Sequence, residues 1–247
     1  MSRGLGDVYK RQIEQSLWQA VPDVLRRLEA QLAEQGLPAP PADWAPVKLA
    51  SWMGGDRDGN PNVTAPVTRE VLLLARWMAA DLYLRDVENL LADLSMKAAS
   101  DELLAATGPT HEPYRVLLRD VRSRLRLTRR QMEAQVEGLP VPEGDAYLRR
   151  EELMAPLQML DRSLRAVGLS DIADGDLKNT LRRLNCFGIT LLRLDIRQES
   201  TRHSEVLDAI TRYLQLGSYN DWDEAARQAF LIDCLLYTSD AADEWLR

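Results

Sequence analysis

The stretch from Trp52 to Thr64, WMGGDRDGNPNVT, concentrates residues that could bind a charged ligand. Glycine permits backbone angles that a Cβ forbids, so such a loop can bend sharply and bring N–H groups close to a ligand. Aspartate, arginine and asparagine add charge and hydrogen-bonding groups. The candidate ligand-binding residues are Gly54, Gly55, Asp56, Arg57, Asp58 and Asn60. On its residues alone, the stretch fits either a functional loop or a structural turn.

A second candidate, Arg197, follows a stretch with the alternation of a β-strand. Apolar and charged residues alternate towards Ile196, and this period of two predicts a strand over 189–196 with one apolar and one polar face. The polar face meets either solvent or a lined cavity. Arg197 stands at the outgoing end of this strand, and α/β enzymes commonly place a site in the loops that follow strands.

The elements around these candidates are predominantly helical. A strand over 47–53 precedes the glycine-rich loop and a long helix over 66–93, and the second strand precedes a helix over 200–215. This order occurs in parallel sheets and in (β/α) barrels, and two strands cannot distinguish them. Further helices are expected at 13–35, with a kink or restart at Pro22, at 100–107 after a Ser100 cap, at 112–137, 148–167 and 176–186, and from Asp221 to about Cys234. The predicted fold class is mainly α with a few β-strands.

Other polar features favour ordinary structural roles. The run from Asp56 to Asn60 lacks the further acidic ligands that complete a calcium loop. Arginines at helical spacing between Arg115 and Arg130 could meet phosphates, but the acidic total favours a solvated, ion-paired helix face and argues against a nucleic-acid partner. Neither histidine is expected to be catalytic. The tryptophans expected to pack in the core or at its edge are Trp18, Trp44, Trp52, Trp77 and Trp222.

Composition indicates a folded globular protein. The 247 residues are 45% hydrophobic and 28% charged, with a net charge of −7. No apolar run is long enough to span a bilayer and no leader opens the chain, so we expect no membrane association and a cytoplasmic location. The two cysteines, Cys186 and Cys234, cannot build a metal tetrad or a disulfide framework, which favours a reducing compartment.

The two candidate motifs resemble phosphoenolpyruvate carboxylase. One is the glycine-rich loop, and the other is LRLDIRQESTRH, residues 192–203. The stretches 13–18, 94–96, 181–183 and 186–188 are also similar to that family. The resemblance runs from Ile13 to Ile232 and covers part of the family's usual length. It identifies the chain as a fragment of such an enzyme that carries part of a (β/α)8 barrel.

The resemblance implies a specific chemistry. Enzymes of this family convert phosphoenolpyruvate and bicarbonate into oxaloacetate and phosphate, an anaplerotic carbon dioxide fixation that feeds the tricarboxylic acid cycle, with Mg²⁺ or Mn²⁺ as cofactor. Arg197 matches the family's phosphate-contacting arginine, and an arginine fork suits a phosphoryl group. The substrate-binding residues carried over are Arg197, Arg57, Gly54, Gly55, Asp56, Asp58 and Asn60. The complete parent is expected to be a homotetramer.

The chain also departs from the family's pattern. The catalytic motif Thr-Ala-His-Pro-Thr and the mobile glycine-arginine loop do not occur in this sequence, and the carboxylates that hold the metal lie outside the matching region. We therefore expect no catalytic residue and no metal ligand within the chain, and no carboxylase activity from it alone. The alternatives are a stand-alone helical binding or regulatory module, and an anion-binding enzyme of another chemistry.

The two ends share an unusual relation. Residues 7–12, DVYKRQ, can be encoded by GATGTGTATAAGAGACAG, and its reverse complement, read one base into frame, encodes CLLYTS, residues 234–239. That DNA resembles the transposase end used in sequencing adaptors. We therefore expect residues 1–12 and 234–247 to be translated adaptor, flanking a carboxylase-like domain over 13–233.

Overall fold

The computed structural model describes residues 12–41 and 43–244, with side chains described as far as Cys234. These residues form two compact units. The first comprises the chain through Gly55 together with Val63–Asp195, and the second comprises Asp56–Asn62 together with the chain from Ile196 onward. The chain therefore passes from the first unit to the second at Gly55 and again at Asp195.

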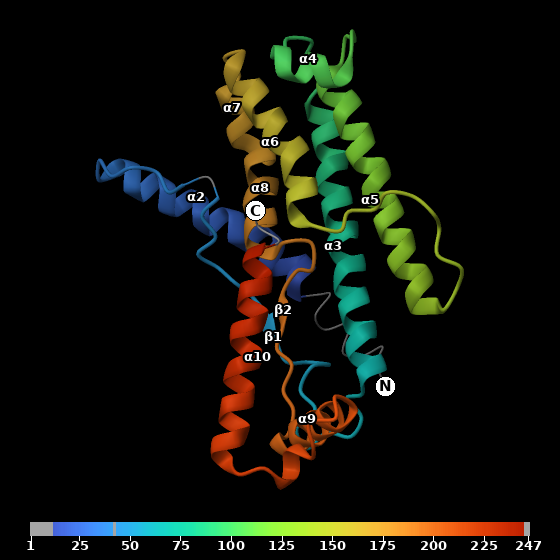
Figure 1. Ribbon diagram of the computed structural model, residues 1–247. Helices are drawn as coiled ribbons and strands as arrows, with labels where there is room; N and C mark the ends of the chain where they lie inside the picture. Colours follow the sequence, from blue (N-terminus) through green and yellow to red (C-terminus); the bar gives the residue numbers. More distant parts are fainter. Residues whose placement is uncertain (1–11, 42, 245–247) are drawn as a thin grey trace. The chain divides into compact units, whose positions relative to one another are not determined.

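The first unit is a set of helices with one small sheet (Figure 1). Its elements are η1 (Ile13–Leu17), α2 (Trp18–Glu34), β1 (Ala50–Ser51), α3 (Ala65–Asp93), α4 (Asp101–Thr107), α5 (Pro113–Glu137), α6 (Arg150–Ala166), α7 (Ser170–Ile172), η2 (Ala173–Leu177), α8 (Lys178–Phe187) and β2 (Arg193–Leu194). The predicted class, mainly α with a few strands, is confirmed. Most helices begin and end within a few residues of the predicted bounds.

Both strands are shorter than predicted. The expected strands over 47–53 and 189–196 reduce to two residues each, which pair in parallel, Ala50 with Arg193 and Ser51 with Leu194. The ladder extends only where both chains are extended, and Leu191 has a left-handed φ of 64° just before β2. The glycine turn ends the ladder on the other side. Parallel pairing agrees with the expectation of a parallel sheet.

The core of the first unit lies between α3, α5, α6 and α8. Along α3, buried side chains such as Leu82, Tyr83 and Val87 point in several directions, as the broad apolar pattern predicted. The apolar stripe predicted on α5 is buried throughout, and it consists of Tyr114, Leu118, Val121, Leu125 and Met132. Leu153, Leu157, Leu160 and Leu164 of α6 are fully inaccessible to solvent. This burial explains why the helices form although the sheet has only two short strands in the described residues.

A buried polar network ties α2, α3 and α8 together. The Arg183 guanidinium donates from Nη1 to both oxygens of Asp86, at 2.9 Å each, and from Nε to the Trp18 carbonyl at 2.7 Å. Trp18 Nε1 donates to Asp86 at 3.3 Å. Both charged side chains are only 8% exposed. Burial raises the pKa of the Asp86 carboxyl even against the attraction of Arg183.

Pro22 explains why the Trp18 carbonyl accepts this bond. Of the two predicted alternatives, the restart did not occur, since Pro22 lies inside α2, which runs from Trp18 to Glu34. Proline has no N–H, so it cannot satisfy the carbonyl four residues earlier, which is that of Trp18. Arg183 supplies the missing donor. The π-turn Ile13–Leu17 widens the helix directly before this position.

The arginine-rich face of α5 is ion-paired, as predicted. Arg115 and Arg119 both contact Glu112, at 2.5 and 3.2 Å. Arg126 pairs with Glu88, and Arg129 pairs with Asp81.

The expectation that the tryptophans pack in the core or at its edge holds for Trp18 but is wrong for Trp44 and Trp52, which are 40% and 59% exposed. Within the described chain, no helix combines the length and apolar character needed to cross a membrane.

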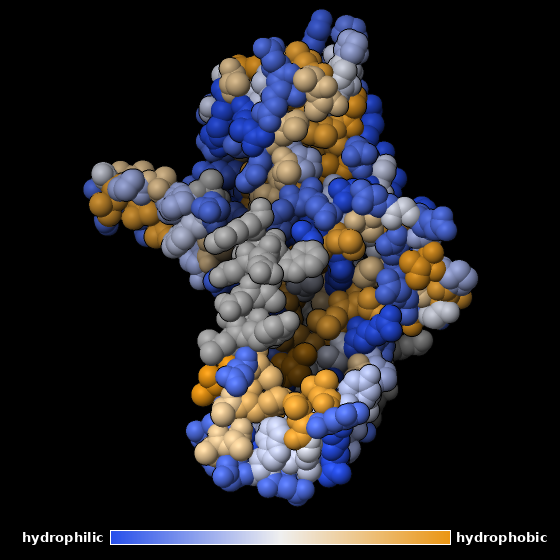
Figure 2. Space-filling model, viewed as in Figure 1, coloured by the Kyte–Doolittle hydropathy of each residue, from blue (hydrophilic) through white to orange (hydrophobic). Residues whose placement is uncertain are grey.

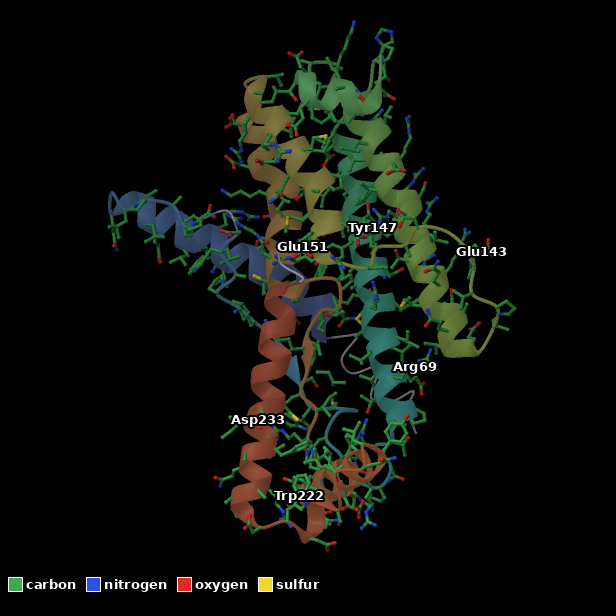
Figure 3. The ribbon with its side chains drawn as sticks, viewed as in Figure 1. Arg69, Glu143, Tyr147, Glu151, Trp222 and Asp233 are labelled. Atoms are coloured by element: carbon green, nitrogen blue, oxygen red, sulfur yellow. The ribbon has the colours of Figure 1, made fainter. Side chains whose placement is uncertain are left out.

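The second unit contains α9 (Ser200–Tyr213), η3 (Tyr219–Asp221) and α10 (Glu224–Glu244). The rings of Tyr219, Trp222 and Phe230 pack together, with centroids 5.4 to 6.4 Å apart. Trp222 is labelled in Figure 3. Asp208 accepts hydrogen bonds that close the α9–η3 connection, and the bond from the Ser218 hydroxyl does most to hold the pKa of Asp208 below its usual value. Figure 2 shows apolar side chains on the surface of this unit. Val206, Ile210 and Ile232 are among its exposed large apolar residues.

Two expectations for the last helix were wrong. Its N-cap is Asp223, whose carboxylate accepts the Ala226 N–H at 2.8 Å, and not Asp221, which lies in the 3-10 turn. The helix also continues past Cys234 to Glu244. The alanines, leucines and acidic residues of that segment favour helix whatever their origin. By contrast, the predicted Ser100 cap of α4 is confirmed, with its hydroxyl accepting the Leu103 N–H.

We expect Asp86→Ala to destabilise this chain strongly. The substitution leaves Arg183 buried without its carboxylate, and breaking a buried pair from one side costs about 3–5 kcal/mol. Glu102→Ala, which removes the exposed partner of Arg162, is the matched control and should leave the free energy of unfolding nearly unchanged. Urea unfolding followed by circular dichroism measures both variants. Equal small effects would show that the buried network contributes little.

Candidate functional site

The loop Asp56–Asn62 is folded by its own side chains. The Asp56 carboxylate accepts the Asp58 N–H at 3.2 Å, and the Asn60 side-chain oxygen accepts the Asn62 N–H at 3.1 Å. The Asn60 N–H donates to the Arg57 carbonyl. The first two bonds form Asx turns, in which an Asp or Asn side-chain oxygen accepts the backbone N–H of the second residue after it. Asp58 and Asn60 themselves are exposed, so their side chains can meet a ligand or solvent.

The second unit brings Arg197 to this loop. Asp56 and Arg197 form an isolated parallel bridge, in which the Arg57 N–H donates to the Arg197 carbonyl at 2.9 Å. The Arg197 Nη1 lies 4.0 Å from an Asp56 oxygen. The Arg197 side chain is 54% exposed and the Asp56 side chain 31%, so solvent weakens this pair. Two regions of sequence that supplied separate candidates therefore meet, with the guanidinium accessible to a ligand.

The preceding glycines, in the first unit, are required for two different reasons. Gly54 has φ +81°, and a Cβ built there would lie 2.5 Å from Cγ2 of Val71. Gly55 lies so close to β2 that a Cβ would come within 2.4 Å of the Asp195 carbonyl oxygen. Left-handed backbone at Gly54 and close backbone approach at Gly55 both exclude larger residues. This agrees with the sequence argument that the loop needs glycine here.

Thr68, which the sequence argument missed, anchors this turn. Its hydroxyl lies 2.8 Å from the Gly54 carbonyl and 3.2 Å from the Thr64 carbonyl. Thr68 is buried in the first turn of α3. The sequence gives no indication of such a role beyond the place of Thr68 in the first helical turn. Its partner lies 14 residues earlier, in a loop.

Comparison with known proteins decides the family. A family model described as phosphoenolpyruvate carboxylase matches residues 10–244. The chain belongs to the phosphoenolpyruvate carboxylase family. It is 94% identical over 221 residues, 90% of its length, to the phosphoenolpyruvate carboxylase of Alcanivorax borkumensis. It is 54% identical over 224 residues, 89% of its length, to the enzymes of that name from Escherichia coli O81 and Escherichia fergusonii.

The match covers only part of these family members. In each case it spans 25% of the relative, so this chain extends over about a quarter of their length. Among the described residues there is no group of three or more His, Cys, Asp or Glu side chains that could hold a metal ion. The adaptor boundaries near residues 12 and 234 stay a prediction, as do the ligand-binding roles of the loop residues and Arg197.

We expect Gly54→Ala and Gly55→Ala each to destabilise the chain by roughly 1–3 kcal/mol, the range for local backbone strain. A Cβ at either position must displace Val71 or the Asp195 backbone. Asn62→Ala is the control, because the Asn62 side chain is exposed at the end of the neighbouring loop. Denaturant unfolding of the three variants provides the measurement. A loss no larger than that of the control would make the loop tolerant of side chains.

Proposed function

We propose that this chain forms part of a carboxylase that makes oxaloacetate and phosphate from phosphoenolpyruvate and bicarbonate. The single observation that carries the proposal is the 94% identity to a phosphoenolpyruvate carboxylase over 90% of the chain. The complete parent protein has the activity, and the chain alone does not. We further propose the (β/α)8 barrel for the parent, with β1 and β2 as two of its strands.

In this proposal Arg197 binds the phosphoryl group of phosphoenolpyruvate. A guanidinium can donate two parallel hydrogen bonds to phosphoryl oxygens and stays charged at neutral pH. Asp56, 4.0 Å away, is close enough to orient the side chain and too distant for a strong hydrogen bond. The Arg197 side chain is 54% exposed, so its guanidinium can contact a ligand. Arg57, Asp58 and Asn60 belong to the same loop and contribute charge and hydrogen bonds.

The remaining parts of the machinery belong to the rest of the parent protein. Residues outside this chain would hold Mg²⁺ or Mn²⁺, and the bound ion supplies positive charge that stabilises developing anions. Arg197 would add a permanent positive charge, because its guanidinium stays protonated at neutral pH. We propose a homotetrameric, cytoplasmic parent whose oxaloacetate feeds the tricarboxylic acid cycle.

Recovery of the uninterrupted coding sequence tests the proposal. We expect the reading frame to continue beyond both predicted adaptor joints, with the Thr-Ala-His-Pro-Thr motif upstream and the metal-binding carboxylates downstream. The expressed product should form oxaloacetate only when phosphoenolpyruvate, bicarbonate and Mg²⁺ or Mn²⁺ are all present. Start and stop codons near Ile13 and Ile232, with no activity, would favour a stand-alone binding module instead.

In the complete parent, Arg197→Ala should lower kcat/KM for phosphoenolpyruvate. The fall should correspond to a loss of about 2–4 kcal/mol of transition-state stabilisation. Arg197→Lys should lose less, because it keeps the charge and loses the fork. The affinity of the enzyme for bicarbonate should change less than its affinity for phosphoenolpyruvate.

Arg202→Ala is the matched control for this prediction. Arg202 is an exposed arginine of the same unit that pairs with Glu205 at 2.8 Å, and its loss should leave kcat/KM near the starting value. Steady-state kinetics beside a melting curve separates the explanations. If Arg197→Ala lowers the melting temperature while the folded enzyme keeps its kinetic constants, the Arg197 side chain stabilises the fold by pairing with a carboxylate, that of Asp195 two residues away or that of Asp56, and does not bind substrate.

A further inference from the structure

The site loop contains a dipeptide, Asp58–Gly59, whose two residues can react with each other. The carbon of an aspartate carboxyl group lies near the backbone nitrogen of the next residue, and a bond between them closes a succinimide ring. A Cβ on the following residue crowds this ring, and glycine has none. Both residues are exposed, and a Cβ built on Gly59 would meet nothing within 4 Å. The space around the dipeptide therefore allows the ring to close.

Two neighbouring side chains of the loop could react in the same way, and the structure disfavours both. Ring closure requires a backbone nitrogen that is free to attack. Asp56 is followed by Arg57, whose N–H donates to the Arg197 carbonyl at 2.9 Å. Asn60 is followed by Pro61, which has no N–H to lose. Neither side chain therefore has a suitable nitrogen beside it.

Asp58 differs from these two residues in both reacting groups. Over residues 12–41 and 43–234, the structure gives the Gly59 N–H no hydrogen bond. The Asp58 carboxylate has no hydrogen bond or ion pair within the same range, although the Asp58 N–H donates to Asp56. Neither reacting group must therefore leave a partner before the ring closes, and proximity within one chain favours an intramolecular reaction.

A second aspartate–glycine pair, Asp174–Gly175, provides a comparison within the chain. The Asp174 carboxylate accepts a hydrogen bond from Arg165 Nη2 at 2.8 Å and lies 3.4 Å from Lys178 Nζ. The Arg165 hydrogen bond does most to hold the pKa of this carboxyl below its usual value. Ring closure expels a carboxyl oxygen, which leaves readily from the protonated acid and poorly from the ionised group. The two partners therefore slow the reaction at Asp174.

We propose that Asp58 is a site of spontaneous isoaspartate formation. The Gly59 nitrogen bonds to Asp58 Cγ, one carboxyl C–O bond breaks, and the hydroxyl leaves with the N–H proton as water. One water then adds to the ring and opens it. Addition at Cγ restores aspartate, whereas addition at the main-chain carbonyl breaks its bond to nitrogen and leaves the chain running through Cγ. The water lost and the water gained balance, and no oxidant or reductant takes part.

The conversion changes the spacing of the loop. Isoaspartate lengthens the main chain by one carbon at Asp58, between the Arg57 carbonyl and the Asn60 N–H that donates to it. The extra atom shifts the exposed Asn60 side chain relative to Arg57. The complete parent should therefore lose activity gradually as Asp58 converts, a consequence that rests on the proposed function of this loop.

Heavy-oxygen uptake tests the proposal. The folded chain is incubated in oxygen-18 water and digested, and mass spectrometry follows each peptide, which gains one heavy oxygen when its ring opens. Uptake at Asp58 should be about tenfold faster than at Asp174, because two partly exposed ion pairs must first open at Asp174. In urea, which removes these pairs with the rest of the fold, the two rates should become similar. Equal rates in the folded chain, or no uptake at Asp58, would overturn the proposal.

Variants identify the reacting groups. Asp58→Glu keeps the charge but needs a larger ring, so uptake should stop. Asp58→Asn should speed uptake, because ammonia leaves the same ring precursor more readily than hydroxide. Arg165→Gln should raise the rate at Asp174 and leave the rate at Asp58 unchanged. Continued uptake at position 58 in Asp58→Glu would show that the oxygen enters by another route and would overturn the proposal.

The complete parent separates the modification from its effect on activity. After storage at neutral pH, oxaloacetate formation should fall in proportion to the fraction of isoaspartate at Asp58, which isoaspartyl methyltransferase measures. Conversion without loss of activity would count against the proposed role of the loop and would still support the modification site. Uptake in this chain but none in the parent would overturn the modification site itself.

Discussion

The first unit depends on one buried guanidinium. Arg183 joins α8 to the Asp86 carboxylate of α3 and to the backbone carbonyl of Trp18 in α2. Three helices from distant parts of the sequence therefore share one charge that cannot reach water. Because both the carboxylate and the carbonyl need this donor, the helices cannot slide past one another without leaving a polar group unsatisfied. Apolar packing gives the core its stability, and this network fixes the register of the helices.

The same arrangement carries the chain towards the small sheet. One turn before Asp86 on α3, the Tyr83 hydroxyl donates to the carbonyl of Gly188 at 2.7 Å, directly after α8 ends. The chain then passes through the left-handed Leu191 and enters β2. Because α3 also begins beside the glycine turn, through Thr68 and Gly54, one helix contacts both stretches that flank the strands. The glycine turn at Gly54 and the segment before the second strand are therefore both positioned by α3.

The sequence predicted the elements better than their contacts. Helix ends at Ser100, Gly108 and Gly138 follow local rules of capping and backbone freedom, so they could be read from neighbours along the chain. Strand lengths could not, since a ladder depends on a partner more than 140 residues away. The alternative of a helix restart at Pro22 stayed open because its compensating donor, Arg183, is equally remote in sequence.

The candidate site shows the same division. Arg197 and the glycines were found from motif and residue type, whereas the role of Thr68 depends on which segments meet in space. Trp44 and Trp52 were expected to be packed on the grounds of ring size alone. Ring size gives a tendency for burial, and the position of the neighbouring elements decides whether it is realised.

The discontinuity of the second unit has a consequence for synthesis on the ribosome. Asp56–Asn62 and the chain from Ile196 belong to one unit, yet the whole helical core lies between them in sequence. Arg57 therefore leaves the ribosome 140 residues before Arg197, whose carbonyl accepts its N–H. At roughly 5–20 residues per second, this delay is on the order of ten seconds. During that interval the glycine-rich loop has no bridge partner, and only its Asx turns and the anchored Gly54 can hold its shape.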